Sequence, residues 1–124
     1  MMKSLLAGLL LAISASAFAD STVDYDIVFS GKKSGTMQTV IRDDGRRQVT
    51  LSYRDNGRGP DLVERIALLP EGGFRSYRQT GVSTFGAKVD ERFELSGSKA
   101  RWSSPAERGE RAIEGPAVYL PTDG

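Results

Sequence analysis

Two sequence motifs have the residue types and spacing of a serine nucleophile with an activating lysine. Ser30 and Lys33 form one Ser-x-x-Lys motif, and Ser96 and Lys99 form the other. This motif works on a helix, because a helix places the lysine one turn after the serine. Both motifs lie between short segments of extended character, where hairpin turns are expected. We therefore predict no nucleophile at either serine.

Two further patterns have the residue types of ligand sites. Residues 31–35 read Gly-Lys-Lys-Ser-Gly but lack the spacing of a phosphate-binding loop, and we predict a turn there. Asp24 and Asp26 share one face of an expected strand, and paired carboxylates bind calcium or share a proton. No third ligand or loop glycine follows at the spacing that calcium requires, so we predict a solvated strand face. The same interpretation applies to a later group of charges: Asp90, Arg92 and Glu94.

The chain contains no histidine and no cysteine. Zinc, copper and non-haem iron sites rarely form from carboxylates alone. Histidine is also the side chain that most often serves as a general base. We therefore predict no catalytic, cofactor-binding or metal-binding residue in this segment. Four aromatic residues either line a groove for an apolar ligand or, as we favour, form the core: Tyr53, Tyr77, Phe93 and Trp102.

The first nineteen residues have the three parts of a secretory signal peptide. Lys3 is followed by the almost wholly apolar residues 5–13, and residues 17–19 form a small-x-small cleavage site before Asp20. The apolar run is about half of the ~20 residues that cross a bilayer. We predict cleavage after Ala19, a periplasmic or secreted location, and no membrane attachment after cleavage.

Cleavage would leave 105 residues, which is the size of one small domain. These residues carry sixteen basic and sixteen acidic side chains without a block of basic residues, so we predict no nucleic-acid partner. A domain of this length holds together without disulfides when its core is sufficient, which favours the periplasm. Nothing in the pattern indicates an oligomeric state.

Alternating apolar residues in short segments predict an all-β fold. The expected strands are residues 23–29, 36–42, 48–54, 62–69, 74–80, 89–95 and 100–102. The segment 62–69 also fits a short helix, and its length and flanking turns favour a strand. The sequence at residues 43–45, Asp-Asp-Gly, predicts a tight hairpin. Short connections predict an antiparallel meander, because parallel strands need long crossovers.

The single apolar face of such a sheet needs a cover. That cover comes either from curvature of the sheet into a half-barrel or from another domain. Residues 103–114 are predicted to be irregular or to form one helical turn, and they are too polar to cover the sheet. Residues 117–120 resemble the start of another strand, and residues 121–124 resemble a turn that leads onward. We expect residues 20–124 to be the N-terminal fragment of a longer protein, with a natural terminus as the alternative.

The exported start is followed by four groups of residues that form a pattern: Tyr25-Asp26-Ile27 with Gly31 and Gly35, Asn56-Gly57-Arg58-Gly59-Pro60, Val89-Asp90-Glu91-Arg92-Phe93, and Ala100-Arg101-Trp102. This pattern resembles the N-terminal region of secreted bacterial amidohydrolase-superfamily proteins. In that family, a β-rich leader precedes a (β/α)8 barrel that binds a divalent metal through a His-x-His pair and further histidines. None of those ligands has a counterpart here.

The resemblance implies a non-catalytic accessory domain whose partner is a catalytic barrel, downstream in the same chain, that holds the metal and hydrolyses C–N bonds. The alternative is a free-standing periplasmic β-sheet protein that binds a lipid or another apolar ligand. A third possibility is a degenerate gene product without activity. The substrate and the metal lie beyond this segment.

Overall fold

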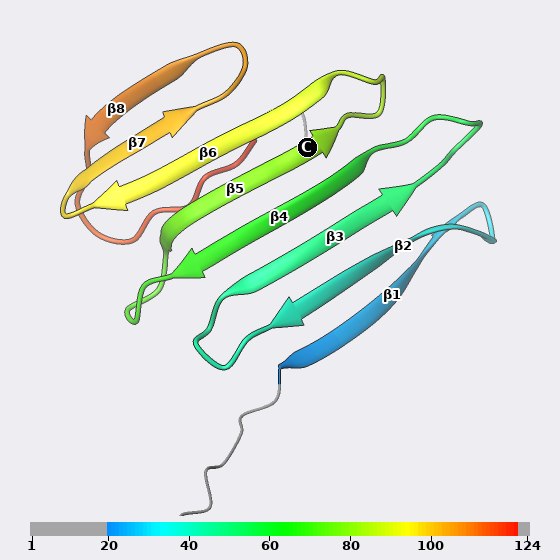
Figure 1. Ribbon diagram of the computed structural model, residues 1–124, viewed down its shortest axis with the longest axis horizontal. Helices are drawn as coiled ribbons and strands as arrows, with labels where there is room; N and C mark the ends of the chain where they lie inside the picture. The colour runs from blue at the N-terminus through cyan, green and yellow to red at the C-terminus, as the bar shows by residue number, and fades with distance from the viewer. Residues whose placement is uncertain (1–19, 122–124) are drawn as a thin grey trace, which may run out of the picture.

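The computed structural model describes residues 20–121 and consists of one sheet of eight antiparallel strands (Figure 1). The strands lie side by side in chain order: β1 Ser21–Phe29, β2 Lys32–Ile41, β3 Arg47–Tyr53, β4 Asp61–Leu68, β5 Phe74–Val82, β6 Lys88–Ser96, β7 Lys99–Ser103 and β8 Arg108–Ala112. The predicted all-β meander is confirmed, and the sheet stays open between β1 and β8. The expected signal peptide and residues 122–124 of the expected final turn lie outside the described residues. No helix among residues 20–121 is long and apolar enough to cross a membrane.

The register sorts the strand side chains onto two faces, because directly opposed residues of antiparallel strands point to the same side. One row crosses six strands through Tyr25, Met37, Leu51, Leu62, Gly81 and Val89. A parallel row follows Ile41, Arg47, Ile66, Tyr77, Phe93 and Trp102. We call the side that carries these rows the apolar face and the other side the polar face.

The first turn is tighter than the sequence analysis predicted. Only Ser30 and Gly31 join β1 to β2, and both have positive φ angles, 50° and 77°. Two-residue turns of this kind match the twist of the flanking strands. Residues 32–35 lie in β2, where the register with β1 shifts between Ile27 and Val28, so the predicted turn at residues 31–35 was wrong beyond Gly31.

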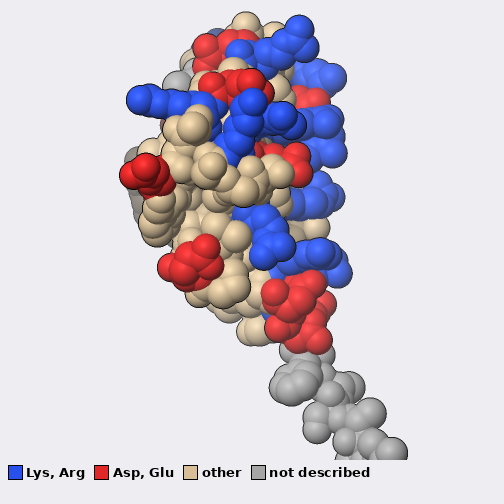
Figure 2. All heavy atoms as spheres, turned by 90° about the vertical axis from the view of Figure 1, so that its left-hand side faces the viewer, with Lys and Arg blue, Asp and Glu red and all other residues tan. Residues whose placement is uncertain are grey.

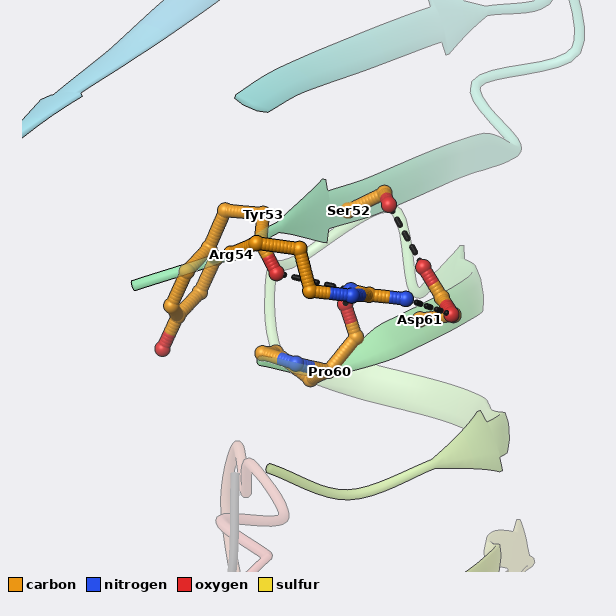
Figure 3. Close-up of polar contacts among 5 residues, drawn as sticks. All are labelled: Ser52, Tyr53, Arg54, Pro60 and Asp61. Atoms are coloured by element: carbon orange, nitrogen blue, oxygen red, sulfur yellow. Dashed lines mark hydrogen bonds and ion pairs between the residues drawn. The ribbon is translucent and has the colours of Figure 1, made fainter. Parts of the chain in front are cut away.

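A polar clamp fixes the end of β3 to the start of β4 (Figure 3). Asp61 accepts hydrogen bonds of 2.5 Å from the Ser52 hydroxyl and from the Arg54 guanidinium. Arg54 also donates to the carbonyl oxygens of Tyr53 and Pro60, at 2.7 and 3.2 Å. These donors hold the pKa of Asp61 below its ordinary value, with the hydrogen bond from Arg54 as the largest cause. The clamp therefore closes the base of the loop at residues 54–60.

Residues 103–114 contain a strand that the sequence analysis did not predict. The sequence of β8 is Arg-Gly-Glu-Arg-Ala, which contains no β-branched or aromatic residue and so gives no strand signal. Pairing with β7 holds it in place along five residue pairs. Glu110 contacts Lys99 at 2.9 Å and Arg101 at 3.2 Å across that pairing. The tertiary partner thus overrides a weak local preference.

The core lies on the apolar face over β5, β6 and β7. Tyr77, Phe93 and Ala100 are buried there. Partly buried apolar side chains pack around them: Ile66, Phe74, Leu95, Trp102, Ile113, Ala117 and Tyr119. Three of these come from residues 113–121, which we call the C-terminal segment. The core is therefore formed between the sheet and the end of the described chain.

The C-terminal segment passes behind the sheet and back towards β5 (Figure 1). The carbonyl oxygen of Ala117 accepts a hydrogen bond of 2.7 Å from the backbone of Phe74. The Tyr119 ring lies 5.7 Å from the Tyr77 ring and 5.8 Å from the Phe93 ring. The segment forms no strand at residues 117–120, contrary to expectation. It covers the core because its few apolar residues face the sheet. Of residues 103–114, which we expected to be too polar to serve as cover, Ile113 takes part.

Candidate functional site

The apolar face over β1, β2 and β3 has no cover among residues 20–121, and we call it the open half. Val23, Tyr25 and Phe29 on β1 are 39%, 47% and 39% exposed. The Phe29 ring packs against that of Tyr53, with the ring centres 5.3 Å apart. Contiguous exposed apolar surface marks contact sites on folded proteins. The open half is therefore the first element of the candidate site.

Three polar side chains interrupt the apolar face beside the core. Glu64, Gln79 and Glu91 are directly opposed on β4, β5 and β6, and we call them the polar triplet. Gln79 and Glu91 are buried. Glu64 accepts hydrogen bonds from Tyr77 at 2.9 Å and Gln79 at 3.0 Å, and Glu91 accepts one from Tyr119 at 2.5 Å. Within the described range, neither carboxylate pairs with a lysine or arginine.

The tyrosines of this cluster are fixed hydrogen-bond donors. Burial, and then the hydrogen bond to Glu64, raises the pKa of Tyr77 far above its ordinary value. Burial, and then the hydrogen bond to Glu91, raises the pKa of Tyr119 to about 12. Both phenols therefore remain protonated at neutral pH. They hold one oxygen of each carboxylate and leave the other oxygen available to a donor group of a ligand or partner.

A groove of about 1080 Å³ adjoins the polar triplet. Its lining combines Val89, Phe93 and Trp102 of the apolar face with the C-terminal segment. Phe85 and Leu120, which are 82% and 80% exposed, also line it. The volume suits a small apolar molecule. A polar group at one end of such a molecule could form hydrogen bonds with the polar triplet.

The structure places both Ser-x-x-Lys motifs in β-hairpins. Ser30 lies in the first turn, whereas Lys33 lies in β2 and pairs with Asp26 at 2.7 Å. Ser96 and Lys99 face each other across the turn between β6 and β7, without a helix. No Ser-x-x-Lys motif therefore has the helical geometry that activation of its serine requires.

The candidate carboxylates of the strand faces also have ordinary partners. Asp24 accepts a hydrogen bond of 2.8 Å from Gln38, so Asp24 and Asp26 bind different groups. Asp90 contacts Arg78 at 3.8 Å and Arg92 at 3.3 Å. Within residues 20–121, no group of three or more acidic residues is arranged to hold a metal ion.

The aromatic residues divide between the two roles considered for them. Tyr77 and Phe93 belong to the buried core, and Trp102 packs against it. Phe93 and Trp102 also line the groove of about 1080 Å³, whereas Tyr53 lies in the open half. Phe93 and Trp102 thus contribute both to the core and to the lining of the groove.

Comparison with protein-family models, with curated proteins and with solved structures finds no match.

One group of residues escaped the sequence analysis. Arginines far apart in the chain, several of them on the polar face, line a second groove of about 990 Å³. The sequence does contain a signal for them, which is their position in the alternation of the strands. Arg65, Arg78 and Arg92 each occupy the polar side of an alternating strand. A search for runs of basic residues does not detect this arrangement, because each strand contributes one or two members.

Proposed function

We propose that this chain is a non-catalytic accessory domain of an exported, metal-dependent amidohydrolase, whose C–N bond hydrolysis resides in a catalytic barrel of the same chain. The resemblance of residues 25–102 to the N-terminal region of that family supports the proposal. The divalent metal would belong to the barrel, because the present sequence contains no histidine to bind it. The role of the sheet would be to shield or position that barrel.

The observation that carries this proposal is the open half of the apolar face. A sheet with one apolar face buries it against a second layer. The C-terminal segment provides that layer over β5, β6 and β7. A (β/α)8 barrel has an outer ring of helices, against which the open half would pack.

The first test is the nucleotide sequence that follows the codon for Gly124. A barrel with a His-x-His motif near its first strand supports the proposal, and an immediate stop codon contradicts it. The second test uses Tyr25→Glu in the full-length protein, which places a charge on the open half. We expect Tyr25→Glu to expose the segment that would join this domain to the barrel to limited proteolysis and to lower metal-dependent hydrolysis. The matched control, Thr22→Glu, adds the same charge on the polar face of the same strand and should leave both unchanged.

The groove beside the polar triplet favours a second function, the binding of a lipid or another apolar ligand. Trp102 lines this groove and is the only tryptophan of the chain, so its fluorescence reports on occupancy. Titration with palmitate should shift the Trp102 emission in the native protein. Leu120→Asp should abolish the shift, because Leu120 lines the groove. Val28→Asp, at an exposed apolar position outside the groove lining, is the control, and an equal loss in both variants would contradict binding in the groove.

A further inference from the structure

The polar face carries three arginines in direct opposition. Arg65 on β4 lies opposite Arg78 on β5, which lies opposite Arg92 on β6. Like charges directly opposite each other destabilise a sheet. A single carboxylate, Asp90, contacts both Arg78 and Arg92, whereas Arg65 has no ion pair among residues 20–121. The acidic neighbours of this row therefore compensate only part of its positive charge.

The row forms one wall of the groove of about 990 Å³. It continues through Ser103 on β7 to Arg108 on β8. The whole groove is lined by two glutamates, no lysine and nine arginines, one of which, Arg47, occupies the apolar phase of β3. In Figure 2, many basic side chains (blue) lie along the right-hand edge of the molecule with acidic ones (red) among them, and further basic side chains lie across the upper part of the visible face. We call the groove of about 990 Å³ the arginine groove.

The charge of the arginine groove is local. Residues 20–124 carry equal numbers of basic and acidic side chains, so no general excess of arginine explains the groove. Of its two glutamates, Glu110 is already bound to Lys99 and Arg101. Glu94 lies opposite Arg101. Arginine forks bind phosphate and carboxylate oxygens in pairs, which lysine does not do.

The shape and lining of the groove restrict the anion that fits. The three directly opposed arginines form a line across β4, β5 and β6, whereas a membrane surface would need a broad patch. Tyr77, Phe93 and Trp102 also line this groove, but they occupy the apolar phase of their strands and pack in or against the core. The walls therefore offer no aromatic platform for the bases of a nucleic acid.

The spacing of the arginines also decides between anions. Neighbouring strands lie ~4.8 Å apart, whereas side chains on one side of an extended peptide repeat every ~6.8 Å. A densely charged linear anion matches the row better than an extended acidic peptide does. We propose that the arginine groove binds a linear chain of phosphate groups, inorganic polyphosphate, laid across β4, β5 and β6.

The test is calorimetric titration with tripolyphosphate of the protein expressed from the full 124-residue sequence. We expect binding that weakens as salt is added, because salt screens exposed charges. Arg78→Gln should weaken binding about tenfold, the effect of losing a hydrogen bond between charged groups. The control Arg111→Gln removes the same charge from the opposite face of β8 and should leave the affinity unchanged.

Thermal unfolding without ligand separates a binding role from a structural one. Relief of repulsion predicts that Arg78→Gln is at least as stable as the native protein. A less stable Arg78→Gln protein would mean that the row is structural and would overturn the proposal, as would equal loss of binding in Arg111→Gln.

Separate titrations test the competing anions. Tighter binding of ATP than of tripolyphosphate would show that a base is recognised. Binding of oligo-dT, polyglutamate or phosphatidylglycerol vesicles, without binding of tripolyphosphate, would assign the groove to a nucleic acid, an acidic peptide or a membrane surface. Each of these results would refute the polyphosphate assignment.

Discussion

Substitution of Tyr119 by phenylalanine tests whether the C-terminal segment holds the core closed. The Tyr119 hydroxyl donates a 2.5 Å hydrogen bond to Glu91, which is 9% exposed. Phenylalanine keeps the ring contacts with Tyr77 and Phe93 and removes only this bond. A hydrogen bond to a charged group contributes ~1.5–3 kcal/mol. We therefore expect Tyr119→Phe to lower the free energy of unfolding by about 2 kcal/mol, within that range.

Urea denaturation followed by Trp102 fluorescence measures this loss, because Trp102 packs against the core that the segment covers. The matched control is Tyr25→Phe, which removes a hydroxyl from a 47% exposed tyrosine on the same face. Surface changes of that kind stay within ~0.5 kcal/mol. If Tyr119→Phe proves no more costly than Tyr25→Phe, the segment does not anchor the core through Glu91, and the structural basis of the groove is refuted.

Three further predictions concern the turn at β3 and the effect of pH. A Cβ atom at Gly59 would lie 1.8 Å from the carbonyl oxygen of Tyr53, so Gly59→Ala should lower the free energy of unfolding by ~3 kcal/mol or more in urea denaturation, at the top of the usual range for overpacking. Folding raises the pKa of Tyr119 from 10.0 to about 12, so its contribution to stability is complete below pH 10.0 and is lost as the pH rises towards about 12. Urea midpoints measured across that interval should fall less in Tyr119→Phe than in the native protein. Folding lowers the pKa of Asp61 below 3.8, so its contribution is present above that pH and is lost on further acidification, and Asp61→Asn should remove this part of the acid transition followed by circular dichroism.

Much of the fold could be predicted because period-2 alternation survives in most strands. Residues 23–29 and 89–95 alternate clearly, and both lie in strands. β8 was missed because its residues have no strand preference of their own, and its contacts with β7 decide its conformation. Gly109 on β8 lies opposite Trp102, where a Cβ atom would come within 2.5 Å of the indole ring. Such a fit depends on a partner strand and leaves no local signal.

The candidate site was harder to predict, because its residues form no sequence motif and come together only in the folded sheet. Glu64 stands between Leu62 and Ile66 in the apolar phase of β4, and Glu91 occupies the same phase of β6. A charged residue at an apolar phase costs free energy unless it is hydrogen-bonded. That conflict was visible in the sequence, but the bonds that resolve it come from Tyr77 and from Tyr119, 28 residues after Glu91.

The two faces of the sheet should act independently, and this can be measured. Neighbouring residues on a strand point to opposite sides, so Tyr77 serves the core while Arg78 serves the arginine groove. Arg78 contacts Asp90, whereas Tyr119 contacts Glu91, so the two share no partner. The double variant Arg78→Gln, Tyr119→Phe should therefore show the sum of the two single changes in unfolding free energy, within ~0.5 kcal/mol. A larger coupling in urea denaturation would mean that the sheet transmits strain between its faces, and that occupancy of one groove alters the other.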